Sequence, residues 1–227
     1  MKITIINGSP RKNGATFKVL NHFKDLLENN NFDISVNFVN LMDYNIKYCI
    51  GCQHCYKTGK CIILDDGVEE IHNIIKNSNG IIWGSPNYAT NISGLLRNFH
   101  DRVHMTMEQM LYRKPCINIV TYENINIMAN KVLNIMKEMV THAGGYNINS
   151  IAIKNSFNQD PLNNKMKWKI DRLAKKLIIK IQKNKPPLFT IIFSKIVIKM
   201  FLKPFVDKNK EQYKGILNSW KEKGIIK

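Results

Sequence analysis

The chain has 227 residues, 44% of them hydrophobic, which is ordinary for a globular protein and enough for one sizeable α/β domain with an appendage. Its net charge of +17 is concentrated in residues 165–185 and 195–227, yet basic and aromatic residues do not interleave and no nucleic-acid motif occurs, so nucleic acid is not an expected partner. No leader precedes the first strand and no apolar run is long and uncharged enough to span a bilayer, so we expect a cytoplasmic protein.

The first stretch reads as a strand, a loop rich in glycine and hydroxyl residues, and a helix. The β-branched run 2–6 ends in a turn, and apolar residues recur at helical spacing over 14–29. Such a loop points backbone N–H groups and the positive end of the helix dipole at one place. Ser9 and Thr16 add hydroxyl donors and Arg11 adds a guanidinium, so the loop suits a terminal phosphate. It has neither the Walker A ending nor G-x-G-x-x-G spacing, and a plain strand-to-helix turn is the alternative.

Strands and helices alternate through the following residues. The expected strands are 34–39, 80–84, 115–121 and 148–153, and the expected helices are 68–76, 93–103, 126–142 and 165–182. This alternation predicts the α/β class, with a doubly wound five-stranded parallel sheet and right-handed crossovers. Ligands of such sheets bind beyond the carboxyl ends of the strands, at the topological switch point.

Three loops that follow strand ends are candidates for that place. They are 8–16, 85–91 and 121–126. In the flavodoxin-like strand order the first and third strands are neighbours, so the second loop would lie beside the phosphate loop. There Tyr88 offers an aromatic wall and Asn87 and Asn91 offer amides. These groups suit a flat heterocycle with polar edges.

Four of the five cysteines fall in the long loop 40–64, spaced C-x2-C-x2-C-x5-C. They are Cys49, Cys52, Cys55 and Cys61. Two short gaps gather three thiolates and the longer gap lets the fourth close the cage, as is typical of cubane iron–sulfur clusters. Structural zinc more often uses two separated pairs, and thiols without a metal are a third possibility. A disulfide framework is not expected in a cytoplasmic protein. Cys116, in an apolar strand, is expected to be buried.

Three segments carry a resemblance to a known family. They are GSPRKNGAT at 8–16, GSPNY at 84–88 and GLLRNFHDR at 94–102. Over about residues 1–155 the chain resembles the NADPH-dependent FMN reductase branch of the flavodoxin-like proteins, and the cysteine loop narrows this to the iron–sulfur flavoprotein and its close relatives. The resemblance implies that the first loop binds the FMN phosphate, that loop 86–91 runs along the isoalloxazine, and that the four cysteines bind a [4Fe-4S] cluster.

The loops and the resemblance together predict the cofactor-binding residues. They are Ser9, Arg11, Asn13, Gly14, Ala15, Thr16, Pro86, Asn87, Tyr88, Ala89, Asn91 and Thr121. Two positions depart from the family pattern. Ala15 stands where the family usually has Asn or Ser, and Ala89 stands where it often has a bulky aromatic residue. The first departure removes a side-chain contact to the phosphate, and the second opens one wall of the flavin site.

The expected function is that of an FMN-dependent oxidoreductase passing electrons between NAD(P)H, or a reduced carrier such as ferredoxin, and an acceptor. No residue is assigned as a catalytic acid or base, because the flavin would perform the chemistry. One alternative is a cluster-free NAD(P)H:FMN or quinone reductase. Another is an electron carrier that docks with ferredoxin, and a third is a zinc-stabilised binding module.

The segment that follows the cysteine loop raises three smaller expectations. His100 and His104 are four residues apart and could bind a metal, but no acidic third ligand is evident, so surface or interface histidines are expected. Asp101 and Arg102 are expected to form a structural ion pair. The methionine-rich segment 105–110 is expected to lie in the core or at a subunit contact. As an apolar surface near the flavin edge it predicts, together with the family resemblance, a homo-oligomer, a dimer or tetramer, whose contacts shield the flavin.

Residues 186–227 are expected to form a C-terminal helical extension beyond a flavodoxin-like domain at 1–185. The stretch 188–205 is apolar, but Lys195, Lys199 and Lys203 are spaced by four and would form one stripe on a helix. Three charges argue against a membrane span and favour burial with the stripe facing water. The host would be a partner subunit, the chain's own domain or, as a peripheral contact, an anionic membrane surface.

Overall fold

The computed structural model describes residues 1–29, 32–123, 125–155 and 160–227. Its centre is a five-stranded parallel sheet in the order β2-β1-β3-β4-β5. The strands are β1 (Lys2–Asn7), β2 (Ser35–Asn40), β3 (Gly80–Pro86), β4 (Pro115–Tyr122) and β5 (Tyr146–Lys154). The predicted fold class is therefore confirmed, and β1 and β3 are neighbours as the flavodoxin-like order requires.

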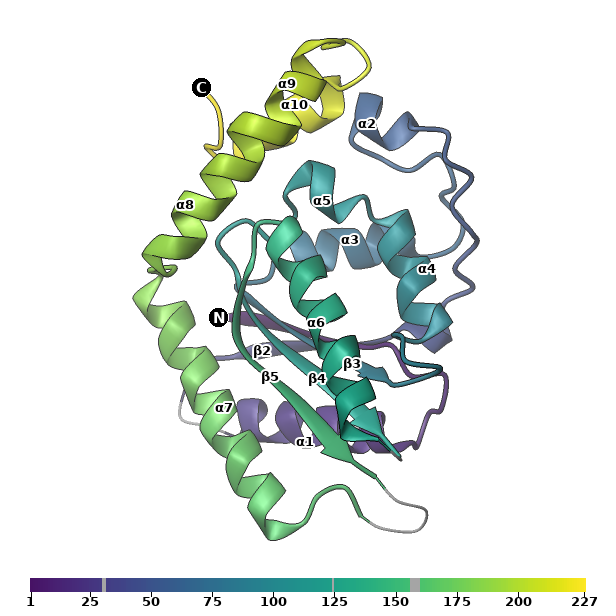
Figure 1. The fold of residues 1–227 in the computed structure, drawn as a ribbon, viewed down its shortest axis with the longest axis vertical. Helices are drawn as coiled ribbons and strands as arrows, with labels where there is room; N and C mark the ends of the chain where they lie inside the picture. The colour runs from purple at the N-terminus through teal and green to yellow at the C-terminus, as the bar shows by residue number, and fades with distance from the viewer. Residues whose placement is uncertain (30–31, 124, 156–159) are drawn as a thin grey trace.

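Helices cover both faces of the sheet (Figure 1). One face carries α1 (Ala15–Glu28) and α7 (Asn164–Lys183), which share a buried core with side chains such as Ile5 and Ile117. The other face carries α3 (Val68–Lys76), α4 (Gly94–Arg102) and α6 (Asn126–His142), packed around Trp83 and Val120. The inner strands are buried on both faces, which explains why their sequences are continuous apolar runs rather than alternating patterns.

Short helices interrupt the connections on the side of α3 and α4. The segment between β2 and α3 contains the 3-10 turn η1 (Leu41–Asp43) and the short helix α2 (His54–Thr58), and α5 (Met105–Glu108) follows α4. Met105 and Met110 are only 1% and 0% exposed and belong to the core. The expectation that this methionine-rich segment offers a subunit surface is therefore wrong, because the fold uses both side chains internally.

The C-terminal residues are helical and return to the cysteine loop. They form α8 (Leu188–Ile196), the π-helical η2 (Val197–Leu202), α9 (Lys203–Asp207) and α10 (Lys214–Glu222). In Figure 1, α8 and α9 lead away from the end of α7, and α10 lies at the top beside α2. Tyr213 stacks on Tyr56 of α2 with ring centroids 5.6 Å apart, and Trp220 is fully buried in a third core. This extension thus forms part of the surroundings of the cysteines.

The outward side of α8 and η2 is not covered by the rest of the chain. Leu188, Phe189 and Met200 are 71%, 75% and 65% exposed, and Lys195 and Lys199 are exposed beside them. The lysine stripe does face outward as expected, but much of the apolar surface faces outward with it. None of the helices described is both long and apolar enough to cross a membrane.

Candidate functional site

A pocket lies where the loops after β1, β3 and β4 meet at the carboxyl edge of the sheet. The predicted cofactor-binding residues that line it are Ser9, Arg11, Gly14, Ala15, Thr16, Pro86, Asn87, Tyr88 and Thr121. The pocket's volume is about 140 Å³. Because β1, β3 and β4 are adjacent strands, residues more than 100 positions apart meet here: the Thr16 Oγ1 and Thr121 Oγ1 atoms are 2.7 Å apart.

The phosphate loop ends at a helix terminus that no side chain caps. The N-cap residue of α1 is Gly14, which has no side chain that could accept hydrogen bonds from the first turn. The N–H groups of that turn are therefore available to a ligand. The loop itself is ordered by its own bonds: the Ser9 N–H donates to Asn7 Oδ1 at 3.1 Å and the Arg11 N–H to Ser9 Oγ at 3.2 Å. An uncapped 14-residue helix pointing into a pocket fits an anionic group such as the FMN phosphate.

The loop after β3 supplies a wall and an unpartnered polar atom. Asn87 lines the pocket, and its N–H donates to the Thr121 carbonyl at 2.8 Å. Its buried Oδ1 accepts no hydrogen bond from the residues that the structure describes. Tyr88 is 38% exposed beside it. Ala89 and Thr90 have φ of 49° and 62°, the left-handed region that non-glycine residues rarely occupy. The strained turn and the unpaired carbonyl are features of a loop that is completed by a ligand.

Three of the predicted cofactor-binding residues do not line this pocket. Asn13 is exposed, and Ala89 lies at the tip of the strained turn. Asn91 pairs with Tyr88 across that turn, and its Oδ1 accepts the Ile92 N–H at 2.8 Å. The side-chain oxygen of Asn91 is therefore used within the turn, and the residue does not line the pocket.

Three residues that line the pocket are not among the predicted cofactor-binding residues, although two of them belong to the predicted loop 121–126. They are Tyr122, Glu123 and Asn155. The Asn155 N–H donates to the Tyr122 carbonyl at 2.7 Å, which joins the ends of β4 and β5. The available signal was the strand-end rule applied to the fifth strand, whose following loop also opens at this edge. Residue 124 of the predicted third loop lies outside the described residues.

The four clustered cysteines line a second cavity, of about 100 Å³, on the α4 side of the molecule. Cys49, Cys52, Cys55 and Cys61 are joined there by side chains of α2 and by Arg102 and His104. Burial, followed by the negative charges that Cys61, Cys49 and Cys52 would carry, raises the pKa of the Cys55 thiol to about 12. The four thiols are therefore close enough to interact. Metal coordination removes the penalty for deprotonating such a group, so the donor set fits a metal or cluster.

Arg102 anchors both ends of the cysteine loop. Its Nη1 donates to the Lys47 carbonyl at 2.6 Å, and its Nη2 donates to the Ile63 carbonyl at 3.3 Å and to Cys61 Sγ at 3.4 Å. It pairs with the buried carboxylate of Asp66 through both terminal nitrogens. Burial opposes this charge, but the Arg102 hydrogen bonds keep the pKa of Asp66 below its usual range. The pair expected between Asp101 and Arg102 is wrong: Asp101 instead pairs with Arg97 on the surface.

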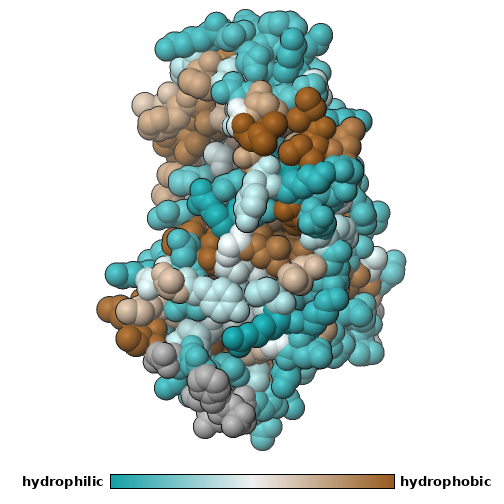
Figure 2. Space-filling view, turned by 90° about the vertical axis from the view of Figure 1, so that its right-hand side faces the viewer, coloured by the Kyte–Doolittle hydropathy of each residue, from teal (hydrophilic) through white to brown (hydrophobic). Residues whose placement is uncertain are grey.

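The mouth of the cysteine cavity is apolar. Ile50 and Ile62 line the cavity and are 69% and 53% exposed, and Leu64 beyond them is 67% exposed. Figure 2 views this side of the molecule and shows hydrophobic side chains gathered on its upper half, bordered by hydrophilic ones. Cys49 and Cys52 are exposed at this mouth, and the apolar side chains around them form a surface on which a partner can dock.

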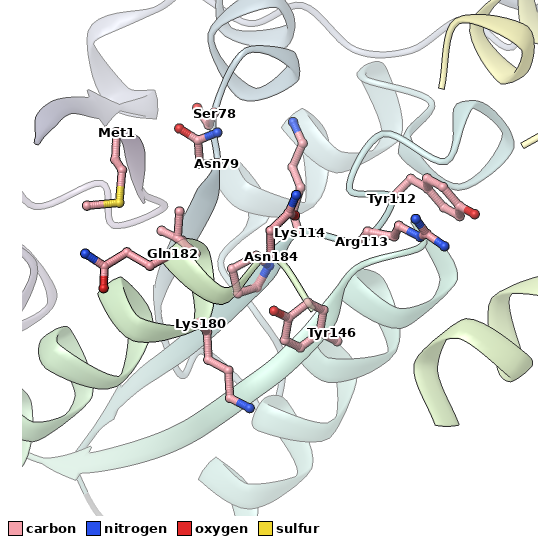
Figure 3. A pocket seen from close by; sticks show the side chains of 12 residues that line it. Met1, Ser78, Asn79, Tyr112, Arg113, Lys114, Tyr146, Lys180, Gln182 and Asn184 are labelled. Atoms are coloured by element: carbon pink, nitrogen blue, oxygen red, sulfur yellow. The ribbon is translucent and has the colours of Figure 1, made fainter. Parts of the chain in front are cut away.

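A third pocket lies at the amino edge of the sheet, away from the strand ends that carry the loops. Its lining includes Arg113, Lys114 and Lys180 (Figure 3). The three cationic groups point in different directions in that view, and the Lys114 Nζ is occupied by the Ile75 and Lys76 carbonyls at 2.7 and 2.6 Å. Because its charges diverge, this pocket does not form a convergent site.

Comparison with known proteins agrees with this geometry. The family model described as NADPH-dependent FMN reductase matches residues 1–159. An iron-sulfur flavoprotein of Clostridioides difficile (strain 630) is 48% identical over 227 residues, 100% of both chains. Two solved structures share the fold at a TM-score of 0.61. One is an NADH:FMN oxidoreductase in its apo form, 15% identical, covering 83% of this chain and 92% of that chain. The other is an FMN-dependent NADH-azoreductase of Bacillus anthracis in complex with FMN, 17% identical, covering 78% and 99%.

Proposed function

The chain belongs to the NADPH-dependent FMN reductase family and is an FMN-reductase-like oxidoreductase, and from this premise we propose that it carries FMN at the carboxyl edge of the sheet and a [4Fe-4S] cluster in the cysteine cavity. Electrons would pass between NAD(P)H and an acceptor through these two groups. The observation that carries the proposal is the meeting of the uncapped α1 terminus with the unpaired Asn87 Oδ1 in one pocket.

The residues of the pocket have distinct parts in holding FMN. The first-turn N–H groups of α1, with the Ser9 and Thr16 hydroxyls, would bind the phosphate. Asn87 and Tyr88 would hold an edge and a face of the isoalloxazine. When bound, FMN would accept a hydride and convert between two-electron and one-electron transfer. The protein has only to position the flavin and set the charges and hydrogen bonds around it. Arg11, which lines the pocket, would supply a positive charge for that purpose.

The cysteine cavity would hold the cluster through Cys49, Cys52, Cys55 and Cys61. Support comes from the shared cavity, from the thiol interactions and from the full-length relative named as an iron-sulfur flavoprotein. Arg102 would donate to the ligand sulfur of Cys61, and hydrogen bonds of this kind raise the potential of a cluster. The Arg102–Asp66 pair holds that donor in place.

We further propose that the protein works as a homo-oligomer with access to a nicotinamide or ferredoxin-type donor. The uncovered apolar side of α8 and the apolar rim of the cysteine cavity are the surfaces that support it. Neither of these two surfaces calls for a nucleic-acid partner. The alternative function, a cluster-free reductase, differs from the proposal only in having no cluster in the cysteine cavity.

The test is the visible spectrum of protein purified without oxygen. We expect flavin bands with a broad iron–sulfur absorption beneath them, FMN rather than FAD on denaturation, and roughly four irons per chain. Anaerobic addition of NADPH should bleach the flavin. Flavin without iron would leave the cluster-free reductase, and reduction by ferredoxin but not NADPH would identify an electron carrier. A colourless protein would refute the proposal.

A further inference from the structure

A buried group of metal-ligating side chains lies next to the cysteine cavity, and of its three members only His104 lines that cavity. His72 of α3, His104 and Glu108 of α5 place one ligand atom each within 4.8 Å of one another. The Nε2 atoms of both histidines face the same carboxylate oxygen: His72 Nε2 is 2.5 Å and His104 Nε2 3.4 Å from Glu108 Oε2. The three side chains are 6%, 5% and 4% exposed.

The imidazole of His104 lacks a well-formed hydrogen bond. Its Nε2 lies 3.4 Å from Glu108 Oε2 but makes no hydrogen bond to the residues that the structure describes, and neither does its buried Nδ1. Nδ1 of His72 is buried without a partner among the same residues. The backbone of His104 has φ of 39°, in the left-handed region that non-glycine residues rarely occupy. Buried polar atoms are nearly always paired, so a ring that stacks on the His72 imidazole, with centroids 5.4 Å apart, and lies beside a carboxylate without a hydrogen bond to it has donor atoms available for a metal.

The carboxylate is supported from its other side. Glu108 Oε1 accepts hydrogen bonds from Ser219 Oγ and Lys223 Nζ, each at 3.0 Å, and both donors belong to the C-terminal segment around α10. Oε2 is left for the two histidines. Metal-ligating carboxylates are commonly oriented by hydrogen bonds to their non-ligating oxygen, and Ser219 and Lys223 stand in that relation to Glu108.

We propose that His72, His104 and Glu108 bind a divalent transition metal, with Zn²⁺ as the ion to test. Two imidazole nitrogens and one carboxylate oxygen form a donor set that suits zinc, with a fourth position left for water. Bound there, the ion would join α3 to α5 and, through Glu108, to α10. It is a site separate from the four cysteines, although His104 also lines their cavity.

The sequence alone did not indicate this site. The spacing of four favours a pair of His100 and His104, but His100 belongs to α4, while His104 follows the end of that helix and is the N-cap residue of α5. The acidic ligand is Glu108, four residues after His104, and the second histidine comes from α3, which only the fold brings near. His100 therefore serves as a matched control: it lies on the same segment, is half-buried and also has unpartnered nitrogens.

The experiment compares full-length proteins expressed with Zn²⁺, dialysed against metal-free buffer and assayed for zinc by mass spectrometry. Because four thiols can also bind zinc, the histidine variants are made in a protein whose Cys49, Cys52, Cys55 and Cys61 are all serine. We expect one zinc per chain in that background, and at least tenfold weaker zinc retention when it also carries His104→Gln or His72→Gln. His100→Gln in the same background should keep its zinc.

Two outcomes would overturn the proposal. They are no zinc in the protein with the four serines, and zinc kept in that background by both His72→Gln and His104→Gln. In each case the three residues form a hydrogen-bonded anchor for α10 instead. Circular dichroism of every variant separates loss of the site from loss of the fold, and since neither FMN nor iron is measured, the result is independent of the proposed function.

Discussion

Gly215 of α10 lies against Gly59 at the end of α2, so closely that a Cβ on Gly215 would stand 2.2 Å from the Gly59 nitrogen. Backbone meets backbone at this point because neither residue has a side chain. The C-terminal helix is thereby seated directly on the segment that carries the cysteines. Any side chain at position 215 must push the two helices apart.

Gly215→Ala should therefore destabilise the protein although alanine is the better helix former. We expect a loss of about 1–3 kcal/mol, the usual cost of overpacking, and faster bleaching of iron–sulfur absorption in air. Thermal unfolding and absorbance measure the two effects. Gly94→Ala is the control: it also lies in the first turn of a helix, but a Cβ there meets nothing within 4 Å. Equal behaviour of the two variants would contradict the close contact.

The buried pair of Asp66 and Arg102 predicts a specific acid sensitivity. Arg102 lowers the pKa of Asp66 against the effect of burial. A carboxylate with a lowered native pKa stabilises the fold fully above its unfolded pKa of about 4, and this stability is lost as the pH falls through the lowered value. Asp66→Asn should cost about 3–5 kcal/mol at pH 7, because it leaves a buried arginine unpaired, and the difference from the unaltered protein should shrink below pH 4.

Urea unfolding at pH 7, 5 and 3 measures this difference. Asp101→Asn is the matched control, since Asp101 pairs with Arg97 on the surface and is 42% exposed. Its loss should be at most about 1 kcal/mol. A cost for Asp66→Asn that is as small, or that does not change with pH, would mean that the pair does not anchor the cysteine loop.

Removing the Thr16 hydroxyl should weaken FMN binding. Thr16→Val keeps the shape of the side chain but removes a donor to a charged phosphate, for which we expect about 1–2 kcal/mol, roughly a tenfold higher Kd. Fluorescence quenching on titration of FMN measures it. Thr4→Val is the control, because Thr4 is also buried and bonds another hydroxyl, that of Ser78, away from the pocket. If both variants bind FMN equally well, the phosphate binds elsewhere.

Single cysteine substitutions should separate cluster ligands from the core thiol. Cys52→Ser should lose the iron and its absorption while retaining FMN, because the two pockets have no lining residue in common. Cys116→Ser should keep the cluster, since Cys116 is fully buried within β4. Iron analysis after anaerobic reconstitution decides between them. Iron retained in full by Cys52→Ser would remove that residue from the predicted ligand set.

The uncovered side of α8 and η2 predicts a subunit contact. Combined Phe189→Ser and Met200→Ser should lower the oligomeric state seen by light scattering and leave FMN bound. Ile127→Ser is the control, as Ile127 is 67% exposed on α6. Substitution is preferable to deleting residues 186–227, because deletion would also remove Tyr213 from α2. An unchanged oligomer that no longer sediments with anionic vesicles would instead assign this side to a membrane surface.

The sequence by itself determined the sheet and the three loops that surround its carboxyl edge. Apolar strands that alternate with amphipathic helices form a parallel sheet covered by helices on both faces. The predicted helices 68–76 and 126–142 have the same bounds as α3 and α6. The loop after β1 could be recognised because a strand, a turn with two glycines and a helix follow one another directly over residues 2–28. Elements of that kind are determined by residues that are neighbours in the sequence.

Only the tertiary structure decided which distant residues meet. Arg102 forms its ion pair with Asp66 rather than with the neighbouring Asp101, because α4 packs over the ends of the cysteine loop and buries the guanidinium. Asn91 bonds within its own loop, whereas Asn155, which follows β5, lines the pocket. His72, His104 and Glu108 converge only because α3 and α5 pack together beneath α10. Such pairings depend on packing between elements that are remote in the chain, so the spacing of residues along the sequence cannot predict them.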